Sequence, residues 1–594
     1  MLKSLFRLRV FIHPYRGRLL LGIFAFLLAR LFEASVPFFM MQGIDKIGAG
    51  DFNLLYPVLG IIGGVLGRFI VVAFARITVR RVSLNMAFDL RQRFYDQLQQ
   101  QGSRFFNRYS IGDMMTRAVA DISLLQRFIA MGTILLVILV FGTLVGFGFM
   151  LSLSPELTLL ILPPLPLVFV YAFYSSKKMG ITSALVQNRL SDIGTHVQEN
   201  LSGIRTIQAM VQEENEIKRF SVTNQQYADA FYEQARITSL MTAWMPVFSA
   251  VSIIIILGYG GTMVQNGTLS IGAFAAFFWY INMVVQPFRV AGFMVNLFQR
   301  AAIASNRLFE VFDLDPEIKD QPSGLTPLAI KGRVEFRNLN FRYPDSEAKT
   351  LNGINLNIKQ GESVCIMGRV GSGKTTLLKQ IVRLLETPAK QIYVDGFDVQ
   401  DYPLRQLRSQ IAYVPQDAFL FGDPLRENLS YDDAERSLEP IWQAAESAAL
   451  KDTIEAFPDQ MQTMVGERGV TLSGGQKQRA TLARGLIRKA AVLILDDCFS
   501  SVDTETEEHI LSELKRLRKN QTTILVSHRV STARHSDRIV ILTDGKISEV
   551  GSHDTLIKLR GYYAELEKIQ REGLQEDQAD DKFEAAFSGP ERSI

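Results

Sequence analysis

Six apolar segments in the first half of the chain constrain its fold more than any other feature. Each is long enough to cross a lipid bilayer, which takes about 20 residues in a helix. A few charged residues interrupt them, but all six remain mostly apolar. They span residues 18–42, 54–78, 129–152, 156–175, 239–265 and 271–297. We therefore expect a six-helix, all-α transmembrane domain over residues 1–312.

The connections between these segments differ strongly in length and charge. The three short connections together contain one basic residue, Lys46, whereas the long connections Val79–Ala130 and Ser176–Leu240 are rich in Arg and Lys. Because basic loops stay on the cytoplasmic side, we expect both termini to be cytoplasmic. The long connections would then form cytoplasmic helical extensions of a protein in the cytoplasmic (inner) membrane. The basic residues Lys3, Arg7 and Arg9 precede the first apolar segment and predict an interfacial amphipathic segment rather than a cleaved signal peptide.

A phosphate-binding motif marks the second half of the chain. Residues Gly368–Thr375 read Gly-Arg-Val-Gly-Ser-Gly-Lys-Thr and lie between a strand-like and a helix-like run, which is the context that a P-loop requires. Glycines let the backbone wrap around phosphates, and the start of a helix adds a positive dipole end. We expect Lys374 to reach the β- and γ-phosphates of ATP and Thr375 to bind Mg²⁺. The candidate ATP-binding residues are Gly368, Arg369, Val370, Gly371, Ser372, Gly373, Lys374, Thr375 and Thr376.

Two further motifs follow the P-loop. The apolar run Val492–Asp496 ends in a carboxylate and fits a Walker B strand, with Asp496 placed to hold Mg²⁺. Just upstream, the pentapeptide Leu472-Ser473-Gly474-Gly475-Gln476 resembles the signature of ABC-family ATPases. We therefore expect an α/β P-loop NTPase (ABC) domain over residues 331–572.

The resemblance assigns further residues of this domain. Tyr343 matches the aromatic residue that stacks on adenine, and Gln416 matches the Q-loop residue that contacts Mg²⁺ or water. His528 matches the switch histidine near the γ-phosphate, and the D-loop would contain Ser500 and Asp503. In the family two such domains pair head to tail, so the signature of each chain acts on the ATP of its partner.

The whole chain resembles a half-size ABC exporter of the type IV fold. The resemblance implies ATP-driven outward movement of amphipathic or hydrophobic substrates, such as drugs, lipids or peptides, by nucleotide-domain dimerisation and alternating access. It also implies two coupling segments, near Phe105–Asp113 and Glu199–Ile207, that dock on the nucleotide domains. Residues 313–330 would form a linker, and the acidic tail 573–594 is expected to be disordered.

One position departs from the family pattern. ABC ATPases usually carry Glu directly after the Walker B aspartate, where it polarises the attacking water, but this chain has Asp497. A base displaced by about 1 Å can lower the rate roughly a hundredfold. An intact signature beside this shortened base resembles the degenerate-site subunit of bacterial heterodimeric exporters, which implies a non-identical partner. A homodimer with two weakened sites remains open because His528 is retained, and so does an ATP-gated channel or regulatory membrane protein.

Four charged residues inside the apolar segments are candidates for a substrate cavity. Arg30 and Glu33 are one helical turn apart and could neutralise each other. Arg68 and Arg289 could instead snorkel toward water, but a charge in a membrane segment is costly and tends to face a cavity. We therefore keep both interpretations, the second being a basic cavity wall for amphipathic or anionic substrates.

Several other functions find no support in the sequence. The net charge is only +4, so nucleic-acid binding is not expected. The two cysteines, Cys365 and Cys498, are too few for a disulfide framework and fit reduced cytosolic thiols. We find no Ser-His-Asp, Cys-His or metal-ligand constellation that would act on a substrate directly.

Overall fold

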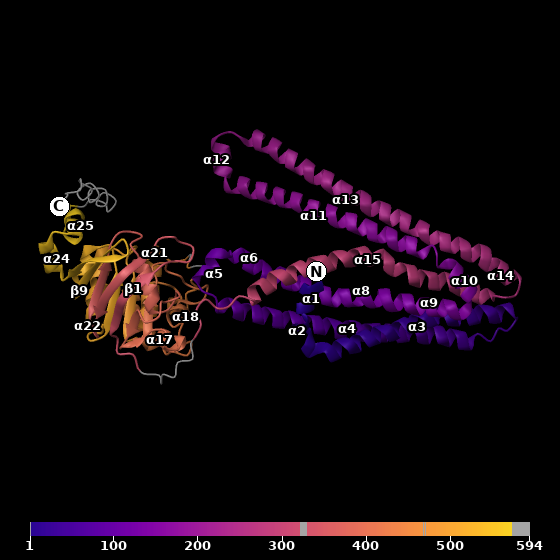
Figure 1. Ribbon diagram of the computed structural model, residues 1–594, viewed down its shortest axis with the longest axis horizontal. Helices are drawn as coiled ribbons and strands as arrows, with labels where there is room; N and C mark the ends of the chain where they lie inside the picture. The colour runs from indigo at the N-terminus through magenta and orange to yellow at the C-terminus, as the bar shows by residue number, and fades with distance from the viewer. Residues whose placement is uncertain (1, 321–328, 467–468, 470, 573–594) are drawn as a thin grey trace. The chain divides into compact units, whose positions relative to one another are not determined.

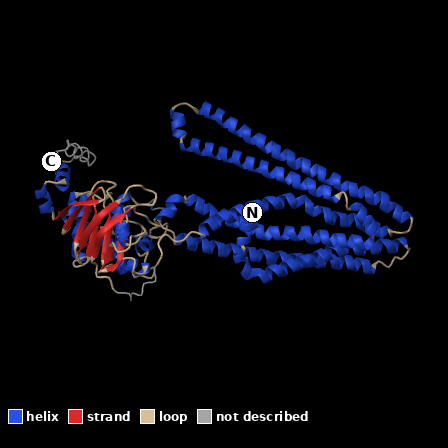
Figure 2. Ribbon diagram, viewed as in Figure 1, coloured by secondary structure: helices blue, strands red, loops and turns tan. Residues whose placement is uncertain are grey.

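The computed structural model describes residues 2–320, 329–466, 469 and 471–572. It divides into two compact units, the first made of Met1–Gln99 with Tyr109–Leu314 and the second of Gln100–Arg108 with Asp315–Ile594. Figures 1 and 2 show a long helical first unit and a second unit that carries the described strands. Residues 321–328 of the expected linker and the whole of the expected acidic tail lie outside the described residues, so the boundaries at 312, 330 and 572 stay predictions.

The first unit consists of helices throughout its described length. A short N-terminal segment, α1 (Leu2–Arg7), α2 (Arg9–Ile12) and η1 (His13–Tyr15), precedes the long helices. The following helical elements are α3 (Arg16–Gly48), α4 (Leu55–Gln99), α6 (Ile111–Thr116), η2 (Arg117–Asp121), α7 (Ile122–Arg127), η3 (Phe128–Gly132), α8 (Thr133–Val137), η4 (Ile138–Gly142), α9 (Thr143–Leu153), α10 (Pro155–Ile161), α11 (Leu165–Ser202), α12 (Ile204–Ala209), α13 (Glu213–Ile255), η5 (Ile256–Gly260), α14 (Gly261–Gln265) and α15 (Ile271–Phe312).

Helices occupy all six places where apolar segments predict membrane crossings. Among the described residues, three stretches are long and apolar enough to span a bilayer, Lys3–Gly48, Leu55–Gln99 and Ile111–Leu153. Shorter apolar helices occupy Ala250–Gln265 and Ile271–Gln286. The remaining crossing, predicted at 156–175, coincides with α10 and the start of α11, where some side chains lie outside the described residues. The helices extend well beyond the apolar segments. α4, α11 and α13 continue into the polar sequence of the long connections.

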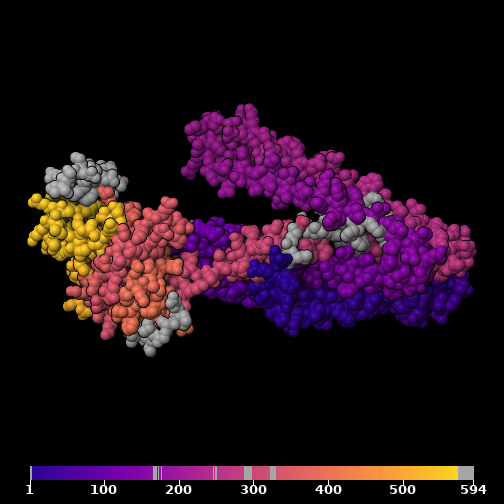
Figure 3. Space-filling view, in the orientation of Figure 1, coloured from indigo at the N-terminus to yellow at the C-terminus, as the bar shows by residue number. Residues whose placement is uncertain are grey.

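The helices of the first unit pack through small and aromatic residues. Tyr280 of α15 is fully buried, and its hydroxyl donates to the carbonyl oxygen of Ala34 in α3 over 2.8 Å. Ala34, Phe277 and Tyr280 belong to one apolar cluster. The α11–α13 pair diverges from the other helices of this unit toward α12, as Figures 1 and 3 show. α12 lies where the second coupling segment was expected.

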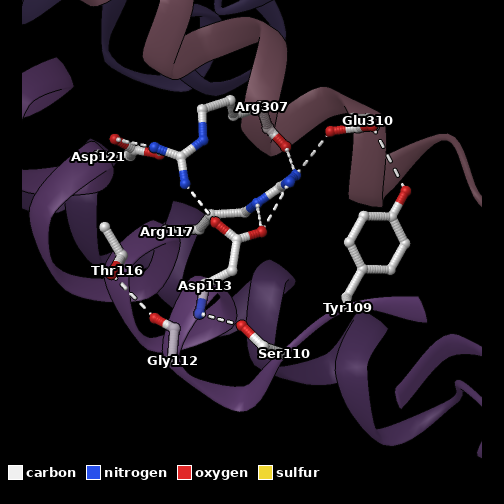
Figure 4. Close-up of polar contacts among 9 residues, drawn as sticks. All are labelled: Tyr109, Ser110, Gly112, Asp113, Thr116, Arg117, Asp121, Arg307 and Glu310. Carbon is white, nitrogen blue, oxygen red and sulfur yellow. Dashed lines mark hydrogen bonds and ion pairs between the residues drawn. The ribbon is translucent and has the colours of Figure 1, made fainter. Parts of the chain in front are cut away.

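A network of charged groups ties α6 and η2 to the last turns of α15 (Figure 4). Arg117 is 5 % exposed; its Nε atom donates to Asp113 and its Nη1 atom donates to the carbonyl oxygen of Arg307. Arg307 in turn pairs with Asp113 and Asp121. Asp113 therefore shares its carboxylate between two guanidinium groups, which fixes α6 against α15.

The described residues of the second unit form two sheets. One is antiparallel with the strand order β2-β1-β4-β5, and the other has the order β10-β9-β3-β8-β7-β6 with β9, β3, β8, β7 and β6 parallel. The strands are β1 (Val334–Phe341), β2 (Leu351–Ile358), β3 (Ser363–Met367), β4 (Ile392–Val394), β5 (Phe397–Asp398), β6 (Ile411–Val414), β7 (Val492–Asp496), β8 (Thr522–Val526), β9 (Arg538–Thr543) and β10 (Lys546–Gly551).

Helices make up much of the rest of the described part of the second unit. They are α5 (Ser103–Arg108), α16 (Lys374–Ile381), α17 (Leu404–Gln410), α18 (Leu425–Leu429), α19 (Leu438–Ser447), α20 (Lys451–Glu455), η6 (Gln460–Gln462), α21 (Gly474–Leu486), α22 (Thr504–Leu517), α23 (Val530–Arg534), α24 (His553–Leu559) and α25 (Tyr562–Arg571). α5 covers part of the first expected coupling segment. Its Phe105 N–H donates to Glu317 over 2.7 Å, and Arg104 pairs with Asp345 at 3.5 Å.

The order of the parallel strands positions the functional loops. β3, β8 and β7 are neighbours, with Ile366 opposite Val526 and Asp496 opposite Val526. The strands are nearly continuous runs of buried apolar residues, as expected for a sheet covered on both faces. In such sheets ligands bind at the carboxyl ends of the strands. The loops that follow β3, β7 and β8 therefore meet at one edge.

Candidate nucleotide-hydrolysis site

The predicted P-loop connects β3 to α16, as its motif requires. Its backbone is left-handed at Gly368, Gly371 and Gly373, where φ is +145°, +83° and +99°. A Cβ atom at Gly368 would lie 2.1 Å from the carbonyl oxygen of Leu542, so only glycine fits there. Lys374 is buried, and its Nζ atom donates to the carbonyl oxygens of Gly368 and Arg369 over 2.7 and 2.8 Å. The loop thus folds around its own lysine and forms a positively charged cradle.

The Walker B carboxylate lies beside the P-loop threonine. The Thr375 hydroxyl donates to Oδ1 of Asp496 over 2.9 Å, and the Tyr413 hydroxyl donates to Oδ2 over 2.8 Å. Burial, and then the neighbouring Asp496, raise the pKa of Tyr413, which keeps its phenol protonated. Thr375 and Asp496 together offer two hard oxygen atoms, and Mg²⁺ prefers few protein oxygens supplemented by water and phosphate. These residues therefore fit Mg²⁺.

Asp497, Gln416 and His528 converge on the same cavity. Their side chains line a hollow of about 310 Å³ together with Lys374, Thr375 and Asp496. Nε2 of Gln416 donates to Oδ2 of Asp497 over 3.2 Å. Burial, and then Asp496, raise the pKa of Asp497 to about 6. Burial, and then Lys374, lower the pKa of His528 to about 4, so its imidazole is neutral at pH 7 and can donate one N–H.

Tyr343 also lies against the P-loop helix. Its hydroxyl is 3.0 Å from the hydroxyl of Thr376, and its ring packs edge-on to Phe341 with centroids 5.0 Å apart. The ring is only partly buried. It therefore presents part of an aromatic surface next to the P-loop helix.

The signature residues lie at the start of α21 and just before it. Ser473 caps α21: its Oγ accepts from the N–H of Gln476 over 3.3 Å, and the Gln476 side chain accepts from the N–H of Ser473 over 2.8 Å. Among the described residues, none of Leu472, Ser473, Gly474, Gly475 or Gln476 lines the P-loop cavity or the adjoining one of about 480 Å³. The signature therefore does not contribute to the phosphate site of its own chain.

The D-loop is held by residues that sequence reasoning left without a function. Gln478 of α21 donates to the Ser500 hydroxyl and accepts from the Ser501 N–H, both over 2.8 Å. Arg529, next to His528, donates to the carbonyl oxygens of Val502 and Ser500. Asp503 instead caps α22 by accepting from the Thr506 N–H. Tyr413 was likewise missed, although its position three residues before Gln416, in the strand that ends at Val414, is a usable signal.

Three of the four candidate cavity residues of the first unit, Arg30, Glu33 and Arg68, form an ion cluster rather than an open set of positive charges. Glu33 of α3 pairs with Arg30 at 2.5 Å and with Arg68 of α4 at 3.2 Å. The neutralisation expected for Arg30 and Glu33 is therefore present, and Arg68, which was expected to snorkel or face a cavity, joins it. The Arg68 side chain remains 47 % exposed. The Arg289 side chain lies outside the described residues.

Comparisons with known proteins agree with this architecture. The family described as "ABC transporter transmembrane region" matches residues 19–288, and the family described as "ABC transporter" matches residues 351–500. An uncharacterized ABC transporter ATP-binding protein, YwjA, of Bacillus subtilis (strain 168) is 33% identical over 94% of this chain and 97% of its own length.

The similar proteins include one named as a flippase and one with a solved structure. An ATP-dependent lipid A-core flippase of Syntrophus aciditrophicus (strain SB) is 33% identical over 95% of this chain and 94% of its own length. The structure of a bacterial Atm1-family ABC exporter with ATP bound superimposes with a TM-score of 0.77 at 25% identity and covers 93% of this chain and 99% of that one. The predicted fold class is confirmed: the chain belongs to the ABC transporter family and is an ATP-hydrolysing, membrane-embedded half-transporter of the type IV exporter kind, which functions as a dimer.

Proposed function

We propose that this chain is one subunit of a heterodimeric ABC exporter whose own ATP site is slow. The observation that carries the proposal is Asp497 at the position after the Walker B aspartate. Its carboxylate lines the phosphate cavity and accepts from Gln416, so it stands where a base is needed but is one methylene shorter than Glu. A reach shortened by about 1 Å is costly because proton abstraction depends steeply on distance.

The signature supports the same asymmetry. It is complete in sequence and capped at Ser473, and it lies away from its own P-loop cavity. It is therefore ready to close over the ATP of a second subunit that supplies its own Glu. The fast site would combine the partner's P-loop with Ser473, Gly474 and Gly475 of this chain.

Different residues of the slow site would bind the phosphates, the adenine, Mg²⁺ and the attacking water. Lys374 and the P-loop N–H groups bind the phosphates, and Tyr343 stacks on the adenine. Thr375 and Asp496 hold Mg²⁺, which neutralises phosphate charge when bound. Gln416 and neutral His528 contact the γ-phosphate side of the cavity, and Asp497 orients water poorly. Closure of two such domains on ATP would move the coupling segments and turn an inward-facing cavity outward.

The cargo we propose is an amphipathic or hydrophobic molecule, such as a drug, lipid or peptide. The ion cluster of Arg30, Glu33 and Arg68 supports this, because it places charged groups within otherwise apolar helices. We place both termini and the ATPase domain on the cytoplasmic side of the inner membrane, following the basic long connections. No nucleic acid is involved.

ATP hydrolysis by the purified full chain, alone and with the second half-transporter encoded beside it, tests the proposal. We expect little activity alone and substantial activity in the mixture. The Asp497→Glu variant should raise the activity of the chain alone on the order of tenfold or more. Asp459→Glu, which lengthens an exposed carboxylate elsewhere in the unit, is the matched control and should change nothing.

Two outcomes would contradict the proposal. Robust turnover by the unmodified chain alone would mean a homodimer in which Asp497 works as the base. No gain from Asp497→Glu, with normal folding, would mean that the missing methylene is not the defect.

A further inference from the structure

We propose that a second cavity of the nucleotide-binding unit binds a small phosphate-bearing anion through Arg518, Lys515 and Lys519. The cavity has a volume of about 210 Å³ and lies where α22 ends and where β3 and β8 begin. The P-loop cavity lies at the opposite, carboxyl ends of the same two strands, and the two cavities share no lining residue. The inference goes beyond the proposed function, and it holds whether the second subunit is identical or not.

A buried arginine without a carboxylate partner lines this cavity. Arg518 is 7 % exposed, and its Nε atom donates to the hydroxyl of Thr523 over 3.1 Å. Its Nη2 atom donates to the carbonyl oxygens of Ala490 and Thr522 over 3.1 and 3.0 Å. These acceptors are neutral, and among the residues that the structure describes no Asp or Glu pairs with Arg518 and no acceptor bonds to its Nη1 atom.

The missing carboxylate matters because of the depth of the guanidinium. Burial lowers the pKa of Arg518 to about 10, so the group still carries its positive charge at pH 7. Charged side chains that are this deeply buried are normally paired with an opposite charge. The chain itself therefore leaves room for a counter-ion from solution at this place.

More positive charge surrounds the same cavity. Lys515 and Lys519 are exposed, line the cavity and form no ion pair with any described residue. Among the described lining residues, the one acidic side chain is Asp537, whose carboxylate accepts from a backbone N–H of β3 over 2.9 Å. His535 also lines the cavity, but its Nε2 atom lies 3.0 Å from the carboxylate of Glu508. Three Arg and Lys side chains thus face one carboxylate, which favours an anion.

A phosphate group fits this set of donors. A guanidinium binds phosphate oxygens with its planar N–H groups, and Lys ammonium groups bind them as mobile point charges. The cavity is smaller than the roughly 300–1,000 Å³ of pockets for drug-sized ligands, which selects inorganic phosphate or a small phosphate ester over a nucleotide. The bound anion would supply the counter-charge that Arg518 lacks and would stabilise the end of α22 against the start of β8.

Protection of the two lysines from acetylation tests the proposal. The full chain is saturated with AMP-PNP and Mg²⁺, so that added phosphate cannot act at the P-loop, and is treated with N-succinimidyl acetate. Mass spectrometry then follows Lys515, Lys519 and, as a control, the exposed Lys546 of β10. A bound anion withdraws the site in proportion to 1 + [L]/Kd, so we expect orthophosphate to slow acetylation of Lys515 and Lys519 roughly threefold or more. Lys546 should react at an unchanged rate.

Three variants show which side chains bind the anion. Arg518→Gln should abolish the protection, with AMP-PNP binding retained as the check of folding. Lys515→Gln leaves the buried arginine in place and should raise the phosphate concentration for half-protection of Lys519 roughly threefold, since one of three cations is lost. Arg516→Gln is the matched control, because it removes an exposed charge that pairs with Glu513 nearby and should keep the protection.

The choice of anion separates the two sources of the phosphate group. Stronger protection by glycerol 3-phosphate than by orthophosphate would identify a small ester as the ligand, and the reverse order would identify free phosphate. Equal slowing by sodium chloride at the same ionic strength would overturn the proposal. So would equal slowing at Lys546, or protection that survives both Arg518→Gln and Lys515→Gln.

Discussion

Nη1 of Arg117 lies 2.9 Å from Oε2 of Glu310, although the two residues are 193 positions apart in the chain. The contact joins the start of the third long helical stretch to the last turns of α15 (Figure 4). The last turns of α15 are thus contacted by the charged network through Arg307 and Glu310 and by the N-terminal segment through Ser305 and Phe309. The end of this helix is therefore fixed by two separate parts of its own unit.

Loss of Arg117 should destabilise this region strongly. Its side chain is 7 % exposed, and Arg117→Met would remove the ion-pair partner of Glu310 and leave Asp113 with Arg307 alone. We expect a cost of about 2–3 kcal/mol, seen as a lower Tm of the purified protein. Arg236→Met, which breaks the exposed pair with Glu233, should cost less than about 1 kcal/mol. Equal Tm changes in the two variants would show that the network adds no stability.

If the transporter is asymmetric, substitutions in the signature and in the P-loop of this chain should lower ATP hydrolysis by unequal amounts. Ser473→Ala should reduce hydrolysis by the assembled transporter at least tenfold, because Ser473 serves the fast site of the partner. The loss of its helix cap should also lower the stability of the protein by about 1 kcal/mol. Lys374→Ala, which empties the slow site, should reduce the rate less. Hydrolysis assays on both variants check this order, and equal losses would favour a symmetric homodimer.

Tyr413→Phe should weaken Mg²⁺ binding without removing a ligand. The lost hydroxyl donates to Oδ2 of Asp496, and partners of a metal-binding carboxylate typically contribute 10- to 100-fold in metal affinity. We expect the Mg²⁺ concentration for half-maximal hydrolysis to rise by about tenfold. Tyr402→Phe removes a buried hydroxyl that donates to the Val394 carbonyl oxygen elsewhere, and it should leave the Mg²⁺ requirement unchanged. A shift of similar size in both variants would contradict the assignment.

Both native cysteines should resist thiol reagents. Burial raises the pKa of Cys365 to about 12 and also raises that of Cys498, so neither forms a thiolate at pH 8. We expect negligible maleimide labelling of the folded protein between pH 7 and 9, and labelling of both thiols after denaturation, measured by mass spectrometry. Rapid labelling of the folded protein at pH 8 would show that β3 or the turn after β7 opens.

Local sequence was sufficient for the type and place of most elements. Apolar runs located the membrane helices, but α4 continues to Gln99 where the apolar run ends near residue 78, since a helix can continue in polar sequence beyond the bilayer. The P-loop, between a strand and a helix, was predictable because its glycines permit a backbone that other residues avoid. The ion cluster of Arg30, Glu33 and Arg68 was only partly predicted from the sequence, because the pairing of Glu33 with Arg68 joins two different helices.

The sequence by itself determined the two-part architecture, the motifs that bind phosphate and the shortened base Asp497, because each depends on residue types at fixed local spacing. Only the tertiary structure decided which distant groups meet: Tyr413 with Asp496, Gln478 with Ser500, and Arg117 with Glu310. The order of β3, β8 and β7 and the packing of α6 and η2 on α15 create these contacts. Such pairings are set by the burial of whole elements against one another, and no local spacing records them.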